Sequence, residues 1–194
     1  MSDLQCPARV FLARHGETEY ESPLMVMQGG SLTTLGRSQA RGLGERLRGE
    51  RIAHVYCSSI SRAVQTAELA AGVLGVEVSV REGLAEFALG DAYGQPAGIG
   101  IFVDEMQRWV AGDVEAAYPG SESAVQVTAR VRPVLDTIAD AHRGESVLVV
   151  AHGGLIVAVQ AVLDFRPGRT WDFANCDYVE LEGDDSGWQV LGKP

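Results

Sequence analysis

The stretch that most constrains the fold of this chain is Ser146–Ala151, a valine-rich apolar run that ends abruptly at His152-Gly153-Gly154. A half-exposed strand alternates apolar and polar residues, whereas a strand buried on both faces is one continuous apolar run. Strands of this second kind occur mainly in parallel sheets covered by helices on both sides. The run therefore predicts an α/β fold, a three-layer arrangement with a mostly parallel sheet flanked by helices.

The other patterns alternate between strand and helix as this fold requires. Pro133 lies inside a predicted helix, where it should bend the helix or indicate that the helix begins later. Turn-forming residues 183–187 join two late strands, which predicts a C-terminal β-hairpin. The expected elements are strands at 9–13, 52–57, 76–80, 146–151, 178–181 and 188–191, and helices at 34–49, 60–74, 121–141 and 155–163.

Two helix beginnings carry residues that typically cap helices. Thr34 is expected to cap the first helix, and Ser58-Ser59 to cap the second. The apolar face of the first helix is expected to hold Leu35, Leu43 and Leu47.

Two regions do not follow the alternation. Residues 19–31 hold proline and glycine without a sustained period, and we interpret them as a loop over the end of the first strand. Residues 81–120 are rich in glycine and contain one amphipathic stretch, Ile99–Val110, so we interpret them as a variable cap segment. The chain, residues 1–194, is expected to form a single domain, since this length suffices for a full core.

The charge limits the partners. The net charge of −10 disfavours nonspecific binding to nucleic acid or anionic membranes, because both need clustered cations. No apolar run approaches the ~20 residues of a membrane span, and residues 1–5 do not read as a signal peptide. We expect a soluble, cytoplasmic protein that contacts neither nucleic acid nor membrane. A site for an anion must then supply its positive charge locally.

The cysteines and metal-ligand residues exclude several chemistries. Cys6, Cys57 and Cys176 lie far apart without a CxxC pair, which argues against a zinc site or a disulfide framework. A cysteine phosphatase has five residues between its nucleophile and a phosphate-binding arginine, but only four separate Cys57 from Arg62. No GxxxxGK[ST] motif is present, and no Asp or Glu cluster accompanies the histidines. We expect no metal and no cofactor.

Three predicted strands end in groups that suit an anion. Arg14-His15-Gly16 follows the first strand, Arg62 lies just past the second, and His152-Gly153 follows the buried strand. Parallel strands place their carboxyl ends at one sheet edge, where α/β proteins bind ligands. Arg62 in a first helical turn opposes the helix dipole, which an anion nearby would compensate. Glu86, framed by apolar residues past the third strand, adds a carboxylate to this set.

These residues together resemble the histidine phosphatase superfamily, also called phosphoglycerate-mutase-like. The likeness runs from about residue 8 to 192. Its pieces are Arg-His-Gly-Glu-Thr at 14–18, Gln28-Gly29, Leu32-Thr33 with Gly36 and Gln39-Ala40, the segment 58–67, Leu84-Ala85-Glu86 with Gly90 and Gly94, Pro119-Gly120-Ser121-Glu122-Ser123, and the segment 149–154.

The resemblance implies covalent catalysis on a phosphate monoester without a metal. His15 would be the nucleophile and form phosphohistidine, and Glu86 would protonate the leaving group and later activate water. The remaining residues would bind the phosphoryl group. They are Arg14, Arg62, His152, Gly153, Thr18, Gln28 and Gly29.

Two departures bear on activity. The family usually has Asn where this chain has Glu21, and a carboxylate there would repel a phosphate dianion unless it turns away. Tyr93 replaces a common Glu before Gly94, and the cap segment is short and poor in arginine for a cofactor-dependent mutase. We favour a phosphatase of small phosphorylated metabolites. The alternatives are a phosphoglycerate mutase-type phosphotransferase and a weakly active phospholigand-binding protein. The sequence leaves the oligomeric state open, a homodimer included.

Overall fold

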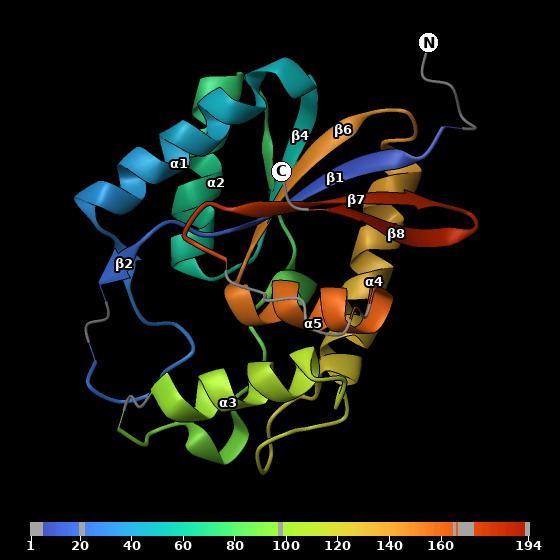
Figure 1. Ribbon diagram of the computed structural model, residues 1–194. Helices are drawn as coiled ribbons and strands as arrows, with labels where there is room; N and C mark the ends of the chain where they lie inside the picture. Colours follow the sequence, from blue (N-terminus) through green and yellow to red (C-terminus); the bar gives the residue numbers. More distant parts are fainter. Residues whose placement is uncertain (1–5, 20–21, 97–98, 165, 167–172, 193–194) are drawn as a thin grey trace.

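The structure is a computed structural model that describes residues 6–19, 22–96, 99–164, 166 and 173–192. Six strands form one sheet in the order β5-β4-β6-β1-β7-β8 (Figure 1). Four of them run parallel, and β7 and β8 form an antiparallel hairpin at one edge. These strands are β1 (Ala8–Arg14), β4 (Ile52–Cys57), β5 (Val78–Val80), β6 (Ser146–Ala151), β7 (Tyr178–Asp184) and β8 (Gly187–Gly192). The predicted α/β fold class is confirmed.

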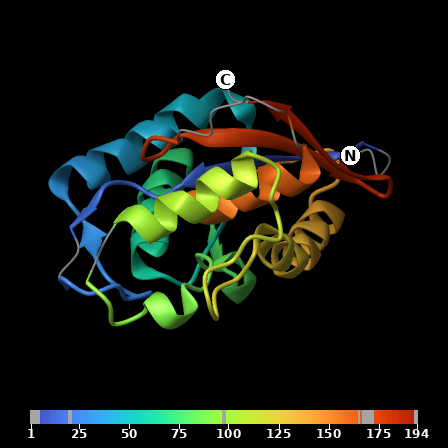
Figure 2. The same cartoon turned by 60° about the horizontal axis from the view of Figure 1, so that its bottom comes forward.

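Helices cover both faces of this sheet (Figures 1 and 2). Alternate residues of β1 serve the two faces, since Phe11 and Ala13 pack toward α1 and α2 while Val10 and Leu12 pack toward α4 and α5. The helix bounds are α1 Thr34–Leu47, α2 Ser61–Leu74, α4 Ala124–Ala141 and α5 Gly153–Leu163. In the described part of the chain, no helix is long and apolar enough to cross a membrane.

The cap segment contains the predicted amphipathic helix, α3 (Ile99–Val110), and two short 3₁₀ helices, η2 (Glu82–Leu84) and η3 (Gly90–Ala92). A third 3₁₀ helix, η1 (Arg48–Glu50), follows α1. α3 lies alongside α5 (Figure 2), and its buried Trp109 meets Phe87 edge to face at 5.0 Å between ring centroids. The segment is thereby attached to the layer that α5 belongs to.

Several predicted details at helix ends are wrong. The N-cap of α1 is Thr33, whose hydroxyl accepts the Gly36 amide. Leu35 is 53% exposed and lies outside the buried face that holds Leu43 and Leu47. α4 begins three residues later than predicted, at a capping box formed by Ser123 and Gln126, and it continues through Pro133. Ser58-Ser59 do not cap α2, because the helix begins later, with Ile60 as the N-cap residue and no side-chain cap.

The region predicted as a loop at 19–31 contributes to a second small sheet. β2 (Thr18–Glu19) pairs antiparallel with β3 (Ser31–Leu32). Next to it, the backbone after His15 lies directly on α1. A Cβ on Gly36 would lie 2.0 Å from the Glu17 carbonyl oxygen, and one on Gly16 would lie 2.6 Å from the Gly36 carbonyl oxygen. The two backbone segments can lie this close only because both Gly16 and Gly36 lack a side chain.

We predict that Gly36→Ala destabilises the protein by about 3 kcal/mol, because its methyl group meets backbone that cannot move aside cheaply. Gly72→Ala is the matched control in α2. No atom lies within 4 Å of its added Cβ, so it should gain about 1 kcal/mol of helix propensity. Urea unfolding measures both variants, and a Gly36→Ala protein as stable as wild type would contradict the close approach.

Candidate active site

The pairing of β1 with β6 places two histidines side by side. Arg14 is in register with Ala151, and the His15 amide donates to the Ala151 carbonyl at 3.0 Å. His15 and His152 follow directly, with ring centroids 5.3 Å apart, and both are at least 96% buried. The predicted meeting of two strand-end histidines is therefore seen in the structure.

The His15 ring is held in one tautomer. Its Nδ1 lies 2.8 Å from the Gly16 carbonyl oxygen, which can only accept, so Nδ1 carries the proton. Arg62 Nε donates to His15 Nε2 at 3.1 Å, so Nε2 carries a lone pair. Burial, and next the nearby Arg62 guanidinium, lower the pKa of His15 to about 3. The ring is consequently a neutral base at neutral pH.

Arg62 is anchored from several sides. It lies in the first turn of α2, and its Nη1 donates to the Gly29 carbonyl at 2.9 Å and to the Met27 carbonyl at 3.3 Å. One turn further on, the Thr66 hydroxyl donates to the Arg62 carbonyl and accepts the Gly16 amide at 3.0 Å. Thr66 thus connects the loop that contains Gly16 to α2. The sequence did not predict this role.

His152 is held in a matching way by Ser58. The Ser58 hydroxyl oxygen accepts the Ile60 amide at 3.2 Å and lies within hydrogen-bond distance of His152 Nε2, 2.8 Å away. The other ring nitrogen, Nδ1, is a buried atom without a hydrogen-bond partner in the described structure. Burial and the neighbouring His15 and Arg62 hold the pKa of His152 well below its ordinary value.

Arg14 and His15 are also held by the segment 173–177. Arg14 Nη1 donates to the Phe173 carbonyl at 2.6 Å, while its buried Nε has no partner among the described residues. Asn175 Nδ2 donates to the His15 carbonyl at 3.0 Å, and the Cys176 amide donates to the Arg14 carbonyl at 3.1 Å. Sequence reasoning missed this segment, because no periodic or motif signal marks it.

Glu86 lies across the beginning of α5. Its Oε2 accepts the Gly154 amide at 3.1 Å, and its Oε1 accepts the Leu155 amide at 2.8 Å and the Phe87 amide at 3.0 Å. Gly154 is required here, since a Cβ would lie 2.4 Å from the Phe87 ring. Burial raises the pKa of Glu86 above its ordinary value, although the three amides and Arg62 act in the opposite direction.

The remaining predicted site residues are less closely tied to this cluster. Gly153 begins α5, and a Cβ there would lie 3.5 Å from Arg14 Nε. Gly29 faces Arg62 with its carbonyl, Gln28 is exposed, and Thr18 lies in β2. The structure therefore brings Arg14, His15, Arg62, His152 and Glu86 together most clearly. Glu21 lies outside the described residues.

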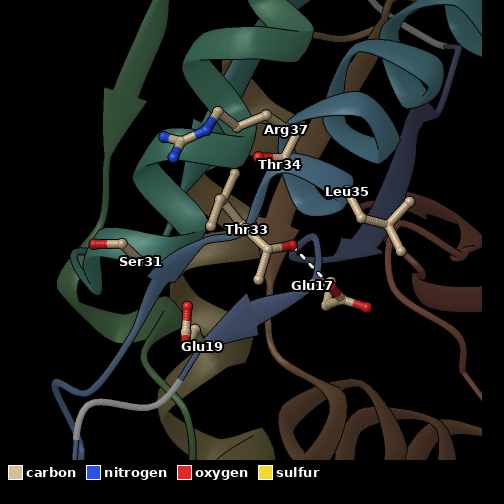
Figure 3. A pocket seen from close by; sticks show the side chains of 8 residues that line it. Glu17, Glu19, Ser31, Thr33, Thr34, Leu35 and Arg37 are labelled. Carbon is tan, nitrogen blue, oxygen red and sulfur yellow. Dashed lines mark hydrogen bonds between the residues drawn. The ribbon is translucent and has the colours of Figure 1, made fainter.

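A hollow of about 520 Å³ lies beside β2, β3 and the beginning of α1 (Figure 3). Its walls include the carboxylates of Glu17 and Glu19, and Glu17 accepts a hydrogen bond from Thr33 at 2.8 Å. None of the five clustered residues lines it. This hollow, which Arg37 also lines, is therefore no part of the candidate site.

The cysteine interpretation agrees with the geometry. Cys57 is fully buried in β4, and burial raises the pKa of its thiol to about 12. A thiol with such a pKa carries almost no thiolate at neutral pH. In the described ranges, no group of three or more His, Cys, Asp or Glu side chains has the arrangement of a metal site.

Comparison with known proteins places this cluster in a family context. The family model described as histidine phosphatase superfamily (branch 1) matches residues 10–193. A curated relative named probable phosphoglycerate mutase GpmB, from Salmonella choleraesuis, is 29% identical in an alignment of 194 positions. This alignment covers 95% of this chain and 89% of the relative.

Solved structures match closely as well. The native mycobacterial glucosyl-3-phosphoglycerate phosphatase Rv2419c has a TM-score of 0.77 at 28% identity, covering 96% of this chain and 98% of that one. Its complex with inorganic phosphate has a TM-score of 0.75 at 30% identity, covering 94% of each chain. Bacillus stearothermophilus YhfR has a TM-score of 0.77 at 29% identity, covering 95% and 96%.

We predict that both rings stay neutral with the proton on Nδ1 between pH 8 and pH 5, because burial and neighbouring cations oppose protonation. Long-range ¹H–¹⁵N NMR spectra report the tautomer. Ser58→Ala should convert His152 to a mixture of tautomers and leave His15 unchanged, and Ser59→Ala is the control. A His15 ring that titrates near pH 6.5 would contradict this arrangement.

Proposed function

The chain belongs to the histidine phosphatase superfamily, and from this premise we propose that it is a metal-independent phosphomonoester hydrolase of small phosphorylated metabolites. The observation that carries the proposal is the His15 ring, a neutral base whose Nε2 lone pair is held against an arginine. A phosphoryl group needs such an in-line nucleophile and positive groups around its equatorial oxygens.

In the proposed first step, His15 Nε2 attacks phosphorus. Arg62 Nε now donates to that nitrogen, so a bound phosphate must take over this donor before the lone pair can react. An N–P bond forms, the bond from phosphorus to the ester oxygen breaks, and the leaving oxygen receives a proton from Glu86. Substrate binding would thus move the Arg62 Nε hydrogen bond from His15 to the phosphate and free the His15 lone pair in the same event.

In the second step, a water molecule attacks the phosphohistidine. Glu86 takes a proton from this water, the N–P bond breaks, and inorganic phosphate and neutral His15 result. A positioned acid–base group of this kind typically contributes about 10²–10⁴-fold to the rate. The partly buried position of Glu86 raises its pKa, which favours the protonated form that the first step consumes.

Two unpartnered atoms support phosphate binding. Arg14 Nε and His152 Nδ1 are buried polar atoms without partners in the described part of the chain, and such atoms are costly to leave unpaired. Phosphoryl oxygens would satisfy both. Charge-assisted hydrogen bonds contribute roughly 1.5–3 kcal/mol each. We expect those from Arg14, Arg62 and His152 together to outweigh the repulsion from a protein of net charge −10.

The choice between hydrolysis and phosphoryl transfer rests on the cap segment. In α3 the described cation is Arg108, and it is paired with Asp113 at 2.8 Å. α3 therefore offers little unpaired positive charge to a doubly anionic substrate. A mutase has to hold such a substrate while it accepts the phosphoryl group back. Hydrolysis is therefore the proposed reaction, while the relative named probable phosphoglycerate mutase makes transfer the alternative that an assay must test.

We predict steady hydrolysis of p-nitrophenyl phosphate that EDTA does not reduce. His15→Ala should abolish both turnover and the acid-labile phosphoenzyme, since no other group holds the nucleophilic position. His54→Ala is the control, because His54 bonds Ser79 on β5 and lies outside the cluster. A folded protein that releases no phosphate from a broad monoester panel would refute hydrolysis. Labelled phosphate that passes quantitatively to a second hydroxyl would establish transfer.

We predict that kcat/KM for alkyl phosphates falls as pH rises through the raised pKa of Glu86, because the acid loses its proton there. Glu86→Gln should lower alkyl phosphate turnover at least about 100-fold. It should remove this alkaline limb as well. p-Nitrophenyl phosphate should be affected far less, since its leaving group hardly needs a proton. Equal slowing of both substrates would exclude Glu86 as the acid.

A further inference from the structure

The acid-bearing segment 83–88 lies outside the strands, and α4 holds its backbone. Arg130 Nη1 donates to the Gly83 carbonyl at 2.8 Å, and Arg130 Nη2 donates to the Glu86 carbonyl at 3.1 Å. A Cβ on Gly83 would lie 2.6 Å from Val134, which shows how directly the segment rests on α4. The carbonyls of Gly83 and Glu86 thus bind the same guanidinium.

Glu122 fixes that guanidinium and holds the same segment independently. Its carboxylate accepts Arg130 Nε at 2.7 Å and Arg130 Nη2 at 2.9 Å, in a two-pronged pair. The Ala88 amide donates to Glu122 Oε2 at 2.8 Å, and the Glu122 amide donates back to the Ala88 carbonyl at 3.0 Å. The pair therefore grips the backbone before and after Glu86.

From these contacts we propose that the Glu122–Arg130 pair positions the catalytic acid, by fixing the segment 83–88 so that the Glu86 carboxyl stays on the first amides of α5. This inference rests on the proposed function of Glu86. Glu122 and Arg130 are positioning residues, because they act through the backbone of Glu86.

The chemistry of the pair fits positioning better than simple stabilisation. Ion pairs with partly exposed side chains, here 27% and 23%, contribute little to folding on their own. Arginine, however, has donors in a fixed planar fork, and here they reach two carbonyls and one carboxylate at once. A lysine carries the same charge on a single nitrogen and cannot make this set of contacts.

The pair also sets the field at the site. The Arg130 charge is close enough to contribute to the lowered pKa of His152. Glu122, paired with Arg130 at 2.7 Å, carries the opposite charge. Removing Glu122 alone would leave an uncompensated cation near the phosphate site, whereas removing Arg130 would free the backbone of Glu86. The two substitutions should therefore differ in the size of their effect on the rate, with the larger loss for Arg130.

The test compares an alkyl phosphate with p-nitrophenyl phosphate in Arg130→Met, Arg130→Lys and Glu122→Gln. Misplacing the acid should lower kcat for the alkyl substrate about tenfold or more in Arg130→Met, with less than about threefold loss for p-nitrophenyl phosphate. Arg130→Lys should not restore the alkyl rate. Glu122→Gln should show a smaller loss of the same kind. Equal losses for both substrates, or rescue by lysine, would overturn the proposal.

The control is Arg9→Met, which removes another arginine that joins two carboxylates, Glu50 and Glu180, at the other end of β1. Its substrate ratio should equal that of wild type. Hydrogen exchange gives a reading that needs no turnover, because Arg130→Met should lower protection at the Leu155 and Gly154 amides. If neither substrate is hydrolysed by wild type, the proposed function fails, and the exchange result alone decides whether the pair positions Glu86. Unchanged exchange would refute it.

Discussion

The parallel pairing of β1 with β6 is the constraint on which the rest of the structure depends. The register sets Arg14 opposite Ala151, so the residues that follow, His15 and His152, leave the sheet at the same edge. Each buried ring needs a partner for at least one of its nitrogen atoms. The structure supplies a backbone carbonyl and Arg62 for one ring, and Ser58 for the other. The chemistry of the edge follows from how two buried imidazoles are satisfied.

Positive charge concentrated in an acidic protein has a further effect on these rings. Arg14 and Arg62 disfavour a second positive charge on His15, and burial acts in the same direction. The histidines are thereby kept as neutral bases and donors while the arginines carry the charge. This separation of roles suits a reaction that needs a lone pair and a cation within hydrogen-bond distance of each other. Within the cluster, Arg14 Nε and His152 Nδ1 have no protein partners in the described structure.

The sequence was sufficient to predict the sheet, the hairpin and the meeting of His15, Arg62 and His152, because each follows from periodicity or from a strand end. It was insufficient where tertiary contacts override local preference. Ser58 has the character of a helix cap, yet its hydroxyl is directed to His152 by the neighbouring strand. Thr33 caps α1 in place of Thr34, and Leu35 lies outside the helix face that packs on the sheet. Asn175 reaches the His15 carbonyl across 160 positions, a distance at which no pattern in the chain gives a signal.

Glu86 shows how the fold reconciles two opposed demands. As a carboxylate it satisfies amides at the first turn of α5, which favours the charged form, but its burial favours the protonated form and prevails. A phosphate dianion held by Arg14 and His152 would add negative charge nearby and raise the pKa of Glu86 further. Substrate binding would then help to supply the proton that the leaving group needs. In the proposed mechanism, the amides would fix where that proton is delivered, so the N-terminus of α5 would contribute by holding the acid.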